Sequence, residues 1–76
     1  MNLWSLPKKQ TFLIDRIHDA LPQEAQLRLH DLGFTAGQHV ECLHEAPLGG
    51  PKVFRIGDAV FSLARDLASA VEVRIS

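Results

Sequence analysis

The chain has 76 residues, of which 46% are hydrophobic and 22% are charged, and its formal net charge at neutral pH is -1. This length predicts a single domain over residues 1–76 that buries only about 60% of its unfolded surface, so binding to a partner or weak self-association would add stability. The lysines and arginines are dispersed along the chain, which argues against a nucleic-acid-binding surface.

Targeting signals and cysteine content indicate the cellular compartment in which the protein works. Residues 1–6 lack a basic segment followed by an apolar one, and no run of about 18 apolar residues occurs, which argues against export and direct membrane insertion. Cys42 is the only cysteine, so the chain has no internal disulfide and no CxxC zinc or redox site. These features predict a cytoplasmic protein.

The first elements are an irregular segment, a strand and a helix. Residues 2–9 show no period and predict an extended lead-in, in which Trp4 either covers the mouth of a barrel, the favoured alternative, or contacts a partner. Residues 11–17 (TFLIDRI) are rich in β-branched and aromatic side chains and predict a strand. After Pro22 the apolar positions Ala25, Leu29 and Leu32 follow helical spacing. Gly33 then predicts a left-handed helix end.

Residues 37–45 (GQHVECLHE) predict the second strand. Val40 and Cys42 alternate with Glu41 before Leu43 breaks the alternation, which indicates a bulge near Leu43. Because Cys42 is in phase with Val40, we expect it to be a buried small hydrophobe and not a reactive thiol.

Residues 46–51 (APLGGP) predict a rigid connection that is not helical. Pro47 and Pro51 push the residues before them out of the helical region, and Gly49 and Gly50 accept positive φ angles at little cost. Leu48 lies at the tip of this connection, either as an exposed partner contact or as a plug folded into the barrel end.

A β-hairpin is expected next, with strands at residues 53–56 and 59–63 around Gly57-Asp58. A two-residue loop pairs Phe54 with Phe61 and Val53 with Ser62. This register places five side chains on the core side of the hairpin: Phe54, Ile56, Ala59, Phe61 and Leu63.

The last segments complete a mainly β fold. Residues 64–69 predict a single 3₁₀ turn, and residues 70–75 predict a strand with Val71, Val73 and Ile75 inward. Five short strands with one helix between the first and the second are most stable as a small, partly open barrel.

The sequence offers little catalytic chemistry. It contains no GxxxxGK[ST], GxSxG or HExxH motif, and Gly49-Gly50 is followed by Pro51, which lacks the N–H of a phosphate cradle. We therefore expect a protein that is not an enzyme and requires no cofactor. His39 and Glu41 lie two residues apart on the outward face of one strand, where a surface histidine is the favoured interpretation. The alternative is a weak site for zinc or iron completed by water, anions or another molecule.

A partner surface is the remaining functional feature. The chain has no tyrosine, and the hairpin register assigns Phe54 and Phe61 to the core, so an aromatic groove for proline-rich peptides is not expected. The core does not explain the apolar side chains of Leu27, Leu48, Val53 and Val60. The predicted partner contacts are Leu48, Leu27 and Trp4.

The order of motifs resembles the ferrous iron transport protein A (FeoA) family. The resemblance rests on RLHDLGF at residues 28–34, then Gly37, APLGGP at residues 46–51, the Gly57 hairpin and FSL at residues 61–63. It covers nearly the whole chain and includes the structural positions Gly33, Pro47, Gly49, Gly50, Pro51 and Gly57.

The resemblance implies an SH3-like barrel and a cytosolic protein that assists FeoB, a ferrous-iron permease with a cytosolic GTP-binding domain. Such a protein would be peripheral at the inner membrane only through this partner. A similar domain forms the C-terminal part of metal-dependent repressors, where it follows a winged helix-turn-helix. The alternative function is therefore a metal-responsive regulatory or sensor module. Since no such segment precedes the domain here, we expect the stand-alone protein.

Overall fold

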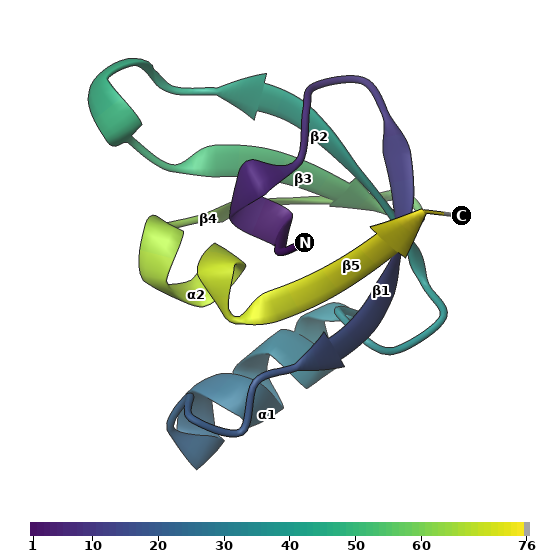
Figure 1. Cartoon of the computed structure of the whole chain (residues 1–76), viewed down its shortest axis with the longest axis vertical. Helices are drawn as coiled ribbons and strands as arrows, with labels where there is room; N and C mark the ends of the chain where they lie inside the picture. The colour runs from purple at the N-terminus through teal and green to yellow at the C-terminus, as the bar shows by residue number, and fades with distance from the viewer. Residues whose placement is uncertain (76) are drawn as a thin grey trace.

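The computed structural model describes residues 1–75 and contains one antiparallel sheet of five strands in the order β4-β3-β2-β1-β5 (Figure 1). The sheet curls into an SH3-like barrel that is not closed, and α1 (Gln23–Leu32) lies between β1 and β2 in the chain, as the sequence predicted. The strands are β1 (Thr11–Ile17), β2 (His39–Glu45), β3 (Lys52–Ile56), β4 (Ala59–Leu63) and β5 (Val71–Ile75), and the short helices are η1 (Leu3–Ser5), η2 (Pro47–Gly49) and α2 (Arg65–Ser69).

The β3–β4 hairpin has the predicted register. Phe54 pairs with Phe61, Val53 with Ser62 and Ile56 with Ala59, and Gly57 has a φ of 59°, as a primed two-residue turn requires. The bulge expected near Leu43 is also present, because the β2–β3 register shifts between Cys42 and His44.

Helix α1 ends where the sequence indicated. Gly33 has a φ of 104°, and the N–H of Phe34 donates to the carbonyl oxygen of Leu29 at 3.0 Å. This turn sends Leu29 and Phe34 into the core, where both are fully buried. Ala25 and Leu32, which share the predicted stripe with Leu29, are half-buried.

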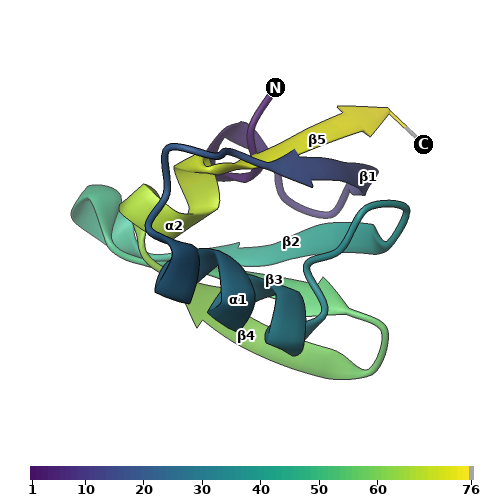
Figure 2. The ribbon, with the colours of Figure 1, turned by 90° about the horizontal axis from the view of Figure 1, so that it is seen from below.

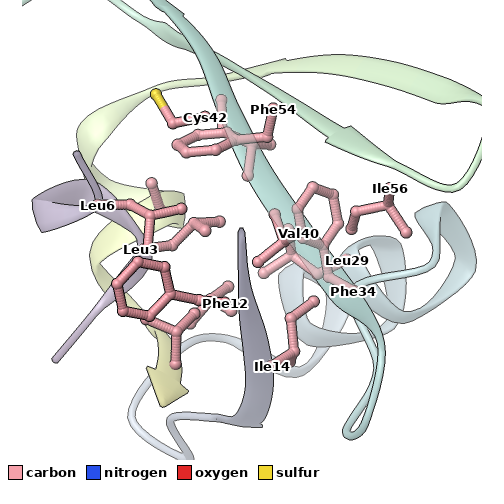
Figure 3. Packing of buried hydrophobic residues seen from close by; sticks show 14 residues of the cluster. Leu3, Leu6, Phe12, Ile14, Leu29, Phe34, Val40, Cys42, Phe54 and Ile56 are labelled. Atoms are coloured by element: carbon pink, nitrogen blue, oxygen red, sulfur yellow. The ribbon is translucent and has the colours of Figure 1, made fainter. Parts of the chain in front are cut away.

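The N-terminal segment differs from the prediction of an extended lead-in. Residues 3–5 form the 3₁₀ turn η1, capped by the Asn2 side chain, and Leu3 and Leu6 are completely buried. Figure 3 shows both leucines beside Phe12 in the core. Backbone bonds hold the segment at both ends, from the Val73 N–H to the Met1 oxygen at 2.8 Å and from the Lys9 N–H to the Cys42 oxygen at 2.9 Å.

Three core assignments need correction. Ala59 is exposed because it adjoins the hairpin turn at the rim of the barrel, and Phe61 is only half-buried against Phe34. Ile75 shares the pleat with the buried Val73, but it ends the sheet's edge strand and remains 82% exposed. All three residues lie on the edge strands β4 and β5, where the inward alternation does not ensure burial.

Two connections also differ. Residues 65–69 form a short α-helix, α2, and not a 3₁₀ turn, because Ala68 is buried in the core and the Ala68 N–H bonds the Ala64 oxygen at 3.0 Å. The connection at residues 46–51 contains the 3₁₀ turn η2, where helix was not expected.

Gly50 in this connection was expected to adopt a positive φ, yet its φ is -68°. A Cβ at Gly50 would lie 2.9 Å from the Cβ of Ala46, so close packing and not backbone freedom explains this glycine. The positive φ angles fall on Gly49 and on Leu48.

Candidate protein-interaction surface

Leu48 is fully exposed at the tip of η2, with a relative accessibility of 105%, so it does not plug the barrel. Its backbone adopts φ 60° and ψ 34°, the left-handed region that costs a non-glycine residue about 1–2 kcal/mol. A strained, exposed leucine stabilises neither the loop nor the core. Backbone strain of this kind concentrates at functional sites, which makes Leu48 a candidate contact residue.

Leu27 is 56% exposed on the outer side of α1. Figure 1 shows α1 and η2 at opposite ends of the molecule, so the fold does not join Leu27 and Leu48 into one surface. The two predicted contacts are therefore separate features.

Trp4 is half-buried and packs against the core cluster. The Lys52 Nζ lies 4.9 Å from the centre of the indole ring, donates a hydrogen bond to the Trp4 backbone oxygen, and lies 2.8 Å from a carboxylate oxygen of Glu45. The hydrogen bond from Lys52 lowers the pKa of Glu45. This network joins residues 48 positions apart and holds Trp4 against the core cluster.

His39 and Glu41 both border a small polar pocket of about 210 Å³ together with Thr11 and Arg55. The Glu41 carboxylate accepts a hydrogen bond from the Arg55 guanidinium, so one of its oxygens is already engaged. Nowhere in residues 1–75 do three metal-ligating side chains come together. This donor set does not fit a resident metal site, which needs about four ligands for zinc.

Cys42 is buried in the core beside Phe54, as the alternation predicted (Figure 3). Burial raises the pKa of the Cys42 thiol. A thiol in this environment stays protonated near neutral pH, which is the opposite of what a nucleophilic or redox-active cysteine needs.

An apolar groove of about 430 Å³ lies between α1 and β4, and Leu67 of α2 also lines it. In Figure 2, α1 crosses in front of the strands and β4 forms the outer edge of the sheet. The residues that line the groove are Arg28, Leu29, Leu32, Pro51, Phe61, Ser62, Leu63, Ala64 and Leu67.

Sequence reasoning did not identify this groove. It treated Leu29, Leu32 and Phe61 as core residues, although Leu32 and Phe61 are only half-buried. A signal was present, since a helix stripe and a hairpin face cannot both be fully covered in a domain this small. Only the packing of α1 against β4 shows where coverage is incomplete.

Comparison with known proteins identifies related folds. The FeoA domain model matches residues 1–75. The FeoA of Stenotrophomonas maltophilia, solved in complex with zinc, is 28% identical, with a TM-score of 0.86 over 97% of this chain and 89% of that chain. FeoA of Chlorobium tepidum is 27% identical, with a TM-score of 0.87 over 99% of this chain and 70% of that one.

A manganese-dependent transcriptional repressor shares the fold at 23% identity, with a TM-score of 0.85 over 96% of this chain and 40% of the repressor. No curated protein matches the sequence. Among the described residues, no helix is long and apolar enough to cross a membrane. The family model spans almost the whole chain, and the chain therefore belongs to the FeoA domain family.

Proposed function

We propose that this chain is a single-domain, cytoplasmic accessory protein of bacterial ferrous iron uptake that binds and modulates a FeoB-type GTPase permease. The observation that carries the proposal is the FeoA domain match over residues 1–75. Related structures described as iron transport or iron uptake regulatory proteins support it.

The surface chemistry fits a binding role better than catalysis. Every charged residue within the described range lies at least partly at the surface, and the one cysteine has a raised pKa in the core. The exposed apolar features include Leu48, Leu27 and the α1–β4 groove. Exposed apolar surface of this kind marks protein–protein contacts, and the protein is not an enzyme in this proposal.

The test is complex formation with the permease, measured by light-scattering mass or pull-down with the full chain. The Leu48→Asp variant should lose at least about tenfold in affinity if Leu48 is a contact, while its unfolding free energy stays within about 0.5 kcal/mol of wild type.

Ile75→Asp is the matched control, because it also places a carboxylate on an exposed apolar side chain, on β5, that is not among the predicted partner contacts. In cells, deletion of the gene should lower ferrous uptake. Unchanged uptake with no second copy of the gene, or absence of a complex with wild-type protein, would count against this function.

A metal-responsive regulatory or sensor module is the second candidate, favoured by the repressor with the same fold. The zinc in the S. maltophilia structure supports at most a weak divalent site at His39 and Glu41 in this chain, completed by water or another molecule. Calorimetry with Fe²⁺, Mn²⁺ and Zn²⁺ separates the candidates. Micromolar affinity that is lost in His39→Ala favours the sensor, whereas the accessory role requires no metal.

A further inference from the structure

The two edges of the sheet are protected very differently. At the β5 edge, Asn2 forms a bridge with Glu72, and the Val73 N–H donates to the Met1 oxygen. Strand β5 also carries two charged side chains, Glu72 and Arg74. Coverage and charge are two means by which proteins prevent edge pairing.

The β4 edge has neither protection. Its sequence is AVFSL, with no charge and no proline, and Val60 is 55% exposed. Within residues 1–75, no backbone hydrogen bond reaches β4 from any element other than β3. An uncharged, uncovered edge invites a further strand.

The hairpin register shows which backbone groups are available. In a two-residue hairpin the residues flanking the loop form a hydrogen-bonded pair, and such pairs alternate along the ladder. Ile56–Ala59 and Phe54–Phe61 are therefore hydrogen-bonded pairs. The N–H and C=O groups of Val60 and Ser62 consequently point away from β3, toward the free edge.

The groove lies along this same edge. Leu32 on α1 and Phe61 and Leu63 on β4 line the same space of about 430 Å³, which is within the range of about 300–1,000 Å³ that ligand clefts occupy. A strand added to β4 would direct alternate side chains into this apolar space. A helix beside a free strand edge is an arrangement that binds extended peptides.

Charge further restricts the occupant. Arg28 lines the groove, and Arg65 is the residue after Ala64, which also lines it. Neither arginine forms an ion pair with any described residue. A bound acidic residue would supply the missing partner for Arg28. The groove thus combines backbone, apolar and electrostatic complementarity to one kind of ligand.

We propose that the α1–β4 groove binds an extended segment of another protein, which pairs as a strand with the free edge of β4, places apolar side chains against Leu32 and Phe61, and carries an acidic residue that faces Arg28. This inference goes beyond the proposed function, since it concerns a binding mode that does not require the permease to supply the segment.

The test uses a displayed library of short random peptides, selected against the full chain and against two matched variants. Ser62→Pro removes an outward N–H without breaking the β3 ladder, because edge strands accept proline on the solvent side. Ser62→Ala keeps the N–H and is the control. Melting curves of both variants confirm that each is folded.

Wild type and Ser62→Ala should enrich peptides that alternate apolar residues and contain an acidic one, and Ser62→Pro should bind them at least about tenfold more weakly. Arg28→Glu should weaken binding of the same peptides about tenfold, whereas Arg74→Glu, the same charge change at the other edge of the sheet, should not. Peptide binding should also slow amide exchange at Val60 and Ser62.

Several results would overturn the proposal: no enrichment, selection of proline-rich peptides, or equal binding by a folded Ser62→Pro. Testing Ser62→Pro against the permease is a separate measurement. If that variant loses the selected peptides but still binds the permease, the groove serves another partner and the proposed function stands.

Discussion

The N-terminal segment (residues 1–9) and the APLGGP connection (residues 46–51) contrast in pattern and in burial. The N-terminal segment has no sequence period, yet Leu3 and Leu6 are completely buried. The APLGGP connection has a specific sequence, yet Leu48 at its tip is completely exposed. Sequence pattern therefore reports local backbone requirements, whereas burial depends on what the rest of the fold leaves uncovered.

The largest expected effect tests this contrast directly. Leu6→Ala should destabilise the protein by about 3 kcal/mol through a cavity in the core, and Leu48→Ala should change stability by less than about 0.5 kcal/mol. The two variants carry the same leucine-to-alanine change, one in each region. Chemical denaturation measures the free energy of unfolding of both. Similar losses for both variants would contradict the structure of the N-terminal segment.

Phe61→Ala should have an intermediate effect, because Phe61 is half-buried with its ring centre 5.9 Å from that of Phe34. We expect a loss of about 2 kcal/mol, below the 3–5 kcal/mol typical of a fully buried phenylalanine. Val60→Ala, the exposed neighbour, serves as the control in the same unfolding measurement. A loss above about 3 kcal/mol would mean that Phe61 is fully buried and the α1–β4 groove is closed.

The smallest effect concerns the network that joins the N-terminal segment to the residues flanking the APLGGP connection, since Lys52 contacts both Trp4 and Glu45. The pKa of Glu45 is lowered below 4.5 by Lys52. Its stabilising contribution is therefore fully present above this ordinary value and is lost as pH falls through the lower folded-state pKa. Glu45→Gln should reduce the acid dependence of the melting temperature below pH about 4.5.

Glu24→Gln, at an exposed first-turn position of α1, is the matched control for this pH series. Identical acid profiles for wild type and Glu45→Gln would show that the Lys52–Glu45 ion pair does not stabilise the fold.

The sequence by itself determined the five strands, the main helix and the turns between them. Gly33, Gly57 and the bulge near Leu43 lie where predicted, because each depends on backbone preferences or alternation within a few residues. The five-stranded barrel with one inserted helix followed from the order of these elements, and the RLHDLGF and APLGGP motifs indicated the family that the FeoA domain match then showed.

Tertiary structure decided the burial of those apolar side chains for which no local pattern was informative. Leu3 and Leu6 became core, while Ile75 stayed exposed, because coverage depends on segments distant in sequence, such as β5 and the N-terminus. The α1–β4 groove and the contact of Lys52 with Trp4 arise in the same way, from elements brought together only by folding. Local propensity carries no information about such long-range contacts, and the proposed binding groove depends on them.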